Sequence, residues 1–162
     1  MNIPETEATK RSELVEEFVR DHKEMSQLLM EVITHLKAKD VAAARSVAQE
    51  LDRVAGPHIQ YEEGDLYPRV SGRAIESEYT RSLYHEHLEA VTSLKLLLCK
   101  DELSEEEVVA VLRGLRNGLK HAEQCGSLVN LLSALPEVAQ RESLVFLREC
   151  RDRGRLWTDL IR

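Results

Sequence analysis

The sequence predicts an all-α protein, an up-down-up-down four-helix bundle with an additional C-terminal helical segment. Aromatic residues make up only 4% and charged residues 31% of the 162 residues, a balance that favours helices over sheet. Apolar residues recur with a period near 3.6 in four long stretches, which is typical of amphipathic helices. The breaks between these stretches are short, as they are between the antiparallel neighbours of a bundle.

The first two helices are expected on either side of a short turn. Apolar side chains form one helical stripe between Ser12 and Lys39, and Asp40 interrupts it. A second helix follows and is ended by the segment Tyr67–Gly72, because proline cannot continue the helix and glycine suits a turn. Pro57 lies inside this second pattern, so we expect a kink just before His58.

The third helix is expected from about Ile75 to Cys99. Ser104 is followed three residues later by Glu107, a capping box that opens the fourth helix. This helix is expected to run to the neighbourhood of Leu135, and a final amphipathic segment follows from residue 137 to the end.

These elements divide the chain into three parts. We expect a flexible N-terminal arm at residues 1–11, a helical bundle at residues 12–135 and a C-terminal helical extension at residues 136–162. The extension is expected to pack on the bundle or on a partner, and a homodimer through the C-terminal helix is one such arrangement.

Composition excludes several classes of partner. The net charge of −7 argues against nucleic-acid binding, which needs a basic face. No stretch approaches the ~20 apolar residues of a membrane helix, and the polar N-terminus does not resemble a signal peptide. Three widely spaced cysteines do not make a disulfide framework, so we expect a cytoplasmic protein.

Four histidines, one in each expected helix, are predicted to lie at the same height. Two residues equally distant from a turn are level in an antiparallel pair, because each residue rises ~1.5 Å. His22 and His58 are centred on the first turn at residue 40. His58 and His87 are centred on residues 72–73, and His87 and His121 on residue 104. Buried imidazoles have few acceptors to share, whereas a metal ion satisfies them together. The sequence therefore predicts a metal site.

The next layer of the bundle supplies further ligands. His58 and Glu62 are four residues apart and share one helix face, and both are usual ligands of first-row metals. The same construction places Phe18, Leu83 and Cys125 level with Glu62. Only Glu62 and Cys125 of that layer can bind a metal. The predicted ligands are His22, His58, Glu62, His87, His121 and Cys125.

The remaining histidines and motifs do not suggest another site. His85 is two residues from His87 and is expected at the surface or behind the ligands, and His35 at the surface. No Glu-x-x-His pair is present, which excludes the ferritin-like class. Glu89 stands where a zincin would need its second histidine. The sequence has no phosphate loop, dinucleotide fingerprint or nucleophile triad, and no catalytic residue is assigned.

Four segments together carry a resemblance to a known family. They are Asp21-His22, HIQYEEGDLYPRV at residues 58–70, EHLEAV at residues 86–91 and Lys120-His121. With these segments the chain resembles the hemerythrin-like family of HHE cation-binding domains over about residues 12–133. The resemblance implies a four-helix bundle that holds a non-heme di-iron centre. It also implies four terminal histidine ligands and a bridging carboxylate, which are His22, His58, His87 and His121 with Glu62.

The chain departs from oxygen-carrying hemerythrins at two positions. Those proteins have a second histidine in the third helix, where this chain has Leu83. They also have a second bridging carboxylate, where this chain has Cys125 and Gly126. Reversible dioxygen carriage is therefore not expected. Cys125 has three interpretations: a metal ligand, a redox-active thiol, or a small core residue with Glu63, Glu123 or solvent supplying an oxygen ligand.

The resulting functional hypothesis is a non-heme iron protein that binds or senses dioxygen, nitric oxide or oxidants such as peroxide. A di-iron centre is preferred, and thiolate ligation by Cys125 would make zinc or a single iron the alternatives. One competing hypothesis is a non-heme iron enzyme that reduces nitric oxide or peroxide or repairs iron-sulfur clusters. Another is a helical interaction module with one zinc or iron ion. An enzyme is the less expected outcome.

Overall fold

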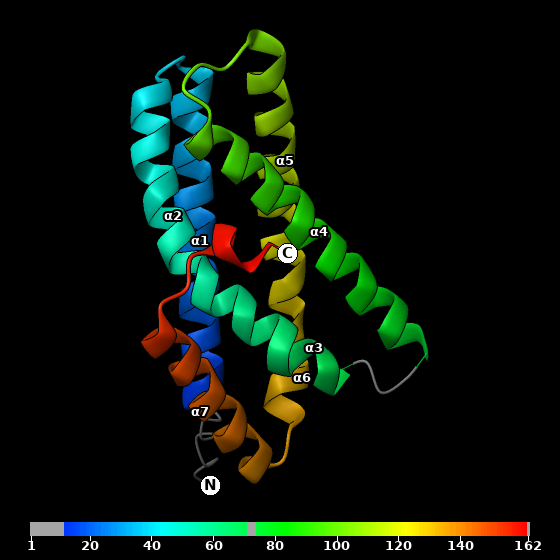
Figure 1. The fold of residues 1–162 in the computed structure, drawn as a ribbon. Helices are drawn as coiled ribbons and strands as arrows, with labels where there is room; N and C mark the ends of the chain where they lie inside the picture. The colour runs from blue at the N-terminus through cyan, green and yellow to red at the C-terminus, as the bar shows by residue number, and fades with distance from the viewer. Residues whose placement is uncertain (1–11, 71–73, 162) are drawn as a thin grey trace, which may run out of the picture.

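The computed structural model describes residues 12–70 and 74–161, and every regular element in this part of the chain is helical. The bundle helices, antiparallel in sequence order (Figure 1), are α1 (Glu13–Lys37), α2 (Val41–Tyr61), α4 (Ala74–Cys99) and α5 (Glu105–Cys125). Helix α1 packs against α2 and α5, and α4 packs against α5 and α2. The predicted all-α, up-down-up-down bundle is confirmed. The arm at residues 1–11 and the turn at residues 71–73 lie outside the described residues.

The helix starts follow from capping side chains. Ser12 accepts a hydrogen bond from the Val15 amide, and Asp40 accepts one from the Ala43 amide at 3.0 Å. Such caps satisfy amides that have no partner within the helix. The predicted capping box at Ser104 and Glu107 is confirmed, because both of its reciprocal hydrogen bonds are present.

The second helix bends near Pro57, as expected, but its α-helical part ends at Tyr61, before the expected end at Tyr67–Gly72. Pro57 lies inside α2, and Figure 1 shows the end of α2 turning aside from the bundle. A π-helical turn, η1 (Glu62–Leu66), follows and leads into the short helix α3 (Tyr67–Val70). A contact from far along the sequence holds this turn, since the Ser143 hydroxyl donates to the Asp65 carboxylate at 2.5 Å.

The fourth helix is also shorter than expected. It ends at Cys125, and the chain continues through a 3₁₀ turn, η2 (Gly126–Leu128), into α6 (Val129–Ala134). Gly126 and Ser127 explain the interruption, because both residue types have lower helix propensity than alanine.

The C-terminal segment packs on the bundle of its own chain. Helix α7 (Glu137–Arg153) lies along α1 and α2, and its arginines pair with acidic residues of α1. Gly154 ends α7 with a φ of 57°, and the chain returns across α2 to η3 (Trp157–Leu160) near the middle of the molecule (Figure 1). Val138 and Val145 on α7 remain exposed, and the homodimer through this helix stays a prediction.

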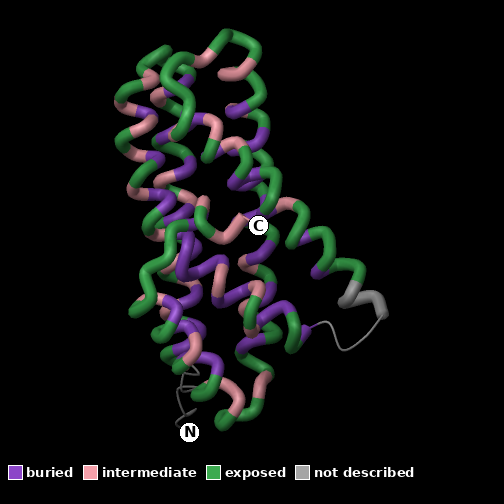
Figure 2. The backbone as a smooth tube through the Cα atoms, viewed as in Figure 1, coloured by how far each residue is buried: buried purple, intermediate pink, exposed green. Residues whose placement is uncertain are grey.

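Two apolar clusters fill the interior, and buried polar side chains separate them. Along α1 one cluster includes Phe18 and the other begins at Met25, with the buried His22 between them. The same order recurs along α4, where His87 lies between Leu83 and Ala90. Figure 2 shows buried residues on the inward faces in both halves. None of the described helices has the length and apolar character needed to cross a membrane.

Candidate metal centre

The four histidines predicted to be level converge in the interior. The rings of His22 and His58 lie with centroids 4.4 Å apart, and those of His87 and His121 with centroids 4.5 Å apart. All four side chains are buried. Histidines equally distant from a turn thus lie at the same height and become neighbours, because each residue of a helix rises by the same amount.

The Glu62 carboxylate lies between the two histidine pairs. Its Oε1 atom is 3.2 Å from Nε2 of His22 and 2.9 Å from Nε2 of His58. Its Oε2 atom is 3.1 Å from Nε2 of His87. One carboxylate oxygen therefore faces His22 and His58 and the other faces His87, and a carboxylate so placed can offer one oxygen to each of two cations.

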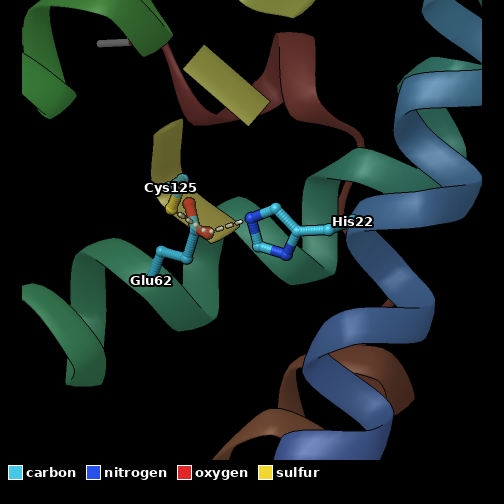
Figure 3. A group of neighbouring side chains, drawn as sticks. All are labelled: His22, Glu62 and Cys125. Atoms are coloured by element: carbon cyan, nitrogen blue, oxygen red, sulfur yellow. Dashed lines mark hydrogen bonds and ion pairs between the residues drawn. The ribbon is translucent and has the colours of Figure 1, made fainter. Parts of the chain in front are cut away.

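The described side chains contain two groups of potential ligand atoms, and Glu62 belongs to both. One group is His22, Glu62 and Cys125, and the other is Glu62, His87 and His121, with the atoms of each group within 4.8 Å of one another. Figure 3 shows the first group, in which side chains from α1, η1 and α5 point toward one another. All six predicted ligands are brought together, since His58 also contacts Glu62.

One atom of the cluster tests whether a cation fits. Nε2 of His121 is buried and has no hydrogen-bond partner among the described residues. A buried ring nitrogen without a partner is costly, and a metal ion would satisfy it. The donor set of imidazole nitrogens, a carboxylate and a thiol suits a first-row transition metal.

The outer nitrogens of three histidines are held by carboxylates in a regular pattern. Nδ1 of His58 is 3.1 Å from Asp21, and Nδ1 of His87 is 3.0 Å from Glu63. His121 is held in the same way by Glu86. Such contacts fix the tautomer and direct Nε2 toward a metal.

Two of these carboxylates come from the bundle helix that precedes the helix of the histidine they hold. Asp21 adjoins His22 in sequence but serves α2, and Glu86 adjoins His87 but serves α5. The pattern stops at α5, where the residue before His121 is the exposed Lys120. Nδ1 of His22 is instead 3.0 Å from the Phe18 carbonyl of its own helix.

Tyr67 is a member of the cluster that the sequence reasoning missed. Its fully buried hydroxyl donates to Oε2 of Glu62 at 2.9 Å and lies 3.2 Å from Nε2 of His87. The π turn explains this contact, because its hydrogen bonds join residues five apart, as Glu62 and Tyr67 are. The signal was the pairing of an aromatic residue with Pro68, but the sequence did not show which way its ring points.

Cys125 lies against the same carboxylate. Its thiol donates to Oε1 of Glu62 at 3.0 Å, and burial together with the Glu62 charge raises the pKa of the thiol. The two other oxygen donors considered for this position lie elsewhere. Glu63 binds the outer nitrogen of His87, and Glu123 is exposed.

The charges of the metal-free cluster follow from burial and from opposite charges. Burial lowers the pKa of His58, but the Glu62 and Asp21 carboxylates outweigh it and raise this pKa to about 9. Burial raises the pKa of Glu62, but the neighbouring histidines hold it well below its ordinary value. Burial and the His87 charge lower the pKa of His121. A bound cation would therefore displace the His58 proton and keep Glu62 ionised.

Other residues considered from the sequence lie away from the cluster or only line it. His85 is exposed and pairs with Glu89 at 3.3 Å, and His35 is partly exposed near the end of α1. Leu83, the position where oxygen carriers have a histidine, is a buried apolar side chain in the cluster that includes Phe18.

Comparison with known protein families gives a match over most of the bundle. The family model described as "Hemerythrin HHE cation binding domain" matches residues 13–121, from the start of α1 to the last histidine of the cluster. No curated protein and no solved structure matches the chain. The resemblance read from the four sequence segments is thereby confirmed.

Proposed function

This chain belongs to the family of hemerythrin HHE cation-binding domains, and from that membership we propose that its buried cluster binds two iron ions that share Glu62. The observation that carries the proposal is the pair of ligand groups with Glu62 in common. One carboxylate oxygen faces His22 and His58, and the other faces His87.

Each half of the centre has its own donor set. The first half would use His22, His58, Cys125 and Oε1 of Glu62, and the second would use His87, His121 and Oε2 of Glu62. Of the three interpretations of Cys125 we propose that of a ligand, because its thiol already donates to Glu62. Coordination would replace the thiol proton, since a thiol that binds a metal is deprotonated.

The second half has space beside it for a small molecule. A cavity of about 20 Å³ adjoins His87 and His121, and its lining is almost entirely apolar. A space of this size holds one particle about as large as water, but apolar cavities bind water poorly. We propose dioxygen, nitric oxide or peroxide as the ligand.

Bound iron would supply an open coordination position and electrons for such a ligand. Apolar side chains around the cavity would exclude water. Asp21, Glu63 and Glu86 hold the tautomers of three histidines, and Tyr67 holds the Glu62 carboxylate in place. We propose a binding or sensing role, in a reducing compartment such as the cytoplasm. Three unpaired cysteines support that location.

A second candidate is a single ion in the first half. The nitrogen, oxygen and sulfur atoms of His22, Glu62 and Cys125 suit zinc as well as iron. In that case the second half would stay without metal, and the protein would act as a helical interaction module.

Metal analysis separates the two candidates. Apoprotein is loaded anaerobically with iron(II), desalted and analysed, and the di-iron proposal predicts about two irons per chain. Glu62→Ala should hold less than about half an iron per chain, because both ions lose a ligand. His85→Ala is the matched control, since this exposed histidine lies outside the cluster, and it should bind as much iron as the unchanged protein.

One iron or zinc per chain, retained when His121 is replaced by alanine, would favour the single-ion candidate. A protein that retained neither iron nor zinc after loading would contradict both candidates.

A further inference from the structure

The C-terminal strap, defined here as residues 154–161, lies outside the range matched by the family model and covers one side of the bundle. Its backbone runs directly against α2. A Cβ atom at Gly56 would lie 1.9 Å from the Arg155 carbonyl oxygen, so only glycine permits this approach. The buried Asp52 then accepts hydrogen bonds from the Thr158 amide at 2.8 Å and from its hydroxyl at 2.9 Å.

The strap separates two spaces beside the metal centre. The outer space is an open cleft of about 490 Å³ between α2, α4 and the strap. The inner space is the apolar cavity of about 20 Å³ that reaches His121. Three residues line both spaces: Ile59, His87 and Trp157. These three side chains therefore form the wall between solvent and the second half of the centre.

We propose that Trp157 is the barrier that decides which molecules reach the metal centre, admitting molecules with two non-hydrogen atoms, such as dioxygen, nitric oxide or peroxide, and excluding larger ones. The inference rests on the proposed ligand binding at the second half. Of the three wall residues, Ile59 and His87 belong to bundle helices, and His87 is itself a proposed ligand. Trp157 is 5% exposed and belongs to a short segment. The adjoining cleft leaves room for its ring to swing outward.

Among the described residues, the cleft on the His58 side of the centre differs from the one beside Trp157. A cleft of about 290 Å³ reaches His58 there, but charged side chains line it. Asp21 binds both His58 and Arg151, with Arg151 donating to both of its carboxylate oxygens. A small apolar molecule would have to pass between paired charges on that side, whereas the cleft beside Trp157 leads to an apolar cavity.

Histidine modification in the apoprotein tests the barrier without any metal. Diethyl pyrocarbonate is larger than a diatomic molecule, reacts with accessible imidazole nitrogens and can be located by mass spectrometry. Trp157→Ala should raise the modification rate of His121 roughly tenfold or more, because an enclosed group reacts only through rare opening. His22 and His58 should stay unmodified. The modification rate of the exposed His85 should be the same in both proteins, which shows that the reagent concentration is equal.

Leu156→Ala is the matched control. This residue is next to Trp157 in the strap, is 37% exposed and lines neither space, so His121 should react as in the unchanged protein. Reactivity of all four cluster histidines in Trp157→Ala would indicate that this variant is unfolded. The modification rate of His121 would then be measured in Trp157→Leu, which keeps apolar bulk at this position. The proposal would be overturned if neither Trp157→Ala nor Trp157→Leu changed the modification rate of His121. It would also be overturned if His58 reacted before His121 in the unchanged protein.

The iron-loaded protein tests the size limit. Nitric oxide should bind to the unchanged protein and to Trp157→Ala, whereas nitrosobenzene should bind only to the variant. Binding of nitrosobenzene to the unchanged protein would overturn the size limit. If neither probe bound to either protein, the proposed function would fail, while the apoprotein experiment would still decide whether Trp157 is a barrier.

Discussion

The two halves of the candidate metal centre differ in what surrounds them. The His22–His58 half lies beside α7, where Arg151 holds the Asp21 carboxylate that in turn holds His58, and the cleft that reaches His58 there is lined by charged side chains. The His87–His121 half faces the cleft and the inner cavity. Its supporting carboxylates, Glu63 and Glu86, are 33% and 27% exposed, against 13% for Asp21. We propose that the first half retains a cation and that the second half exchanges small molecules.

Side-chain chemistry follows the same division. The first half has the Cys125 thiol beside Glu62 and the Phe18 ring packed against His22 at 4.2 Å. The second half has the Tyr67 hydroxyl and a ring nitrogen of His121 that lacks a partner. A single carboxylate joins two environments of different accessibility, so we expect loss of the ion of the second half to abolish ligand binding and loss of the ion of the first half to leave it.

Removing one histidine from each half should break the comparison most strongly. We expect His58→Ala and His121→Ala each to lower the iron content from about two to about one per chain, because each ion loses a terminal ligand. The remaining ion should still bind nitric oxide in His58→Ala and should fail to bind it in His121→Ala. Iron analysis and titration with nitric oxide check this. Equal nitric oxide binding in both variants would show that the halves are equivalent.

Changing the supporting carboxylates should have a smaller effect. Asp21→Asn should weaken the ion of the first half and Glu86→Gln that of the second, each by about 10–100-fold, as is usual for groups that orient metal-binding histidines. Competition with a chelator measures both affinities. Asp152→Asn is the control, because Asp152 is exposed on α7. Losses no larger than in the control would mean that these contacts do not support metal binding.

The dependence on pH should be the mildest effect and should have opposite signs with and without metal. The pKa of His58 is raised from 6.5 to about 9, so its stabilising contribution is complete below pH 6.5 and is lost as the pH rises through 9. The pKa of Glu62 is held well below its ordinary value of 4.5, so the stabilising contribution of this carboxylate is present above pH 4.5 and is lost as the pH falls further. The apoprotein should therefore be most stable between about pH 4.5 and 6.5.

Metal binding should shift this optimum upward, because His58 must lose its proton to bind a cation. Apparent zinc affinity should rise by up to about tenfold per pH unit below the pKa of His58. Thermal melting with chelator and with zinc, between pH 5 and 9, checks both signs. A zinc-loaded protein that became less stable from pH 6 to 8 would contradict the assignment of His58 as a ligand.

The sequence was sufficient for the features that depend on local rules. The helical period, the capping box at Ser104 and the level histidines follow from spacing alone, and the structure has all three. The features it missed depend on distant contacts. The π turn is held by Ser143, and the strap that carries Trp157 is held by Asp52. No local pattern around residues 62–66 or 154–161 indicates those partners.

The supporting carboxylates were visible in the sequence but could not be assigned. Asp21 and Glu86 each precede a histidine, which suggests that they serve it. A residue one position away on a helix points about 100° to the side, toward the neighbouring helix, and each of them holds the histidine found there. The height of a residue in the bundle can therefore be predicted from sequence spacing, whereas its contact with a neighbouring helix can be assigned only from the structure.

The sharing of Glu62 by two iron ions is the central claim, and the magnetism of the oxidised, iron-loaded protein tests it most directly. Two iron(III) ions joined by one carboxylate should couple antiferromagnetically, so the protein should hold about two irons per chain and give no electron paramagnetic resonance signal at low temperature. A signal from isolated high-spin iron(III) that accounts for all of the bound iron would contradict it.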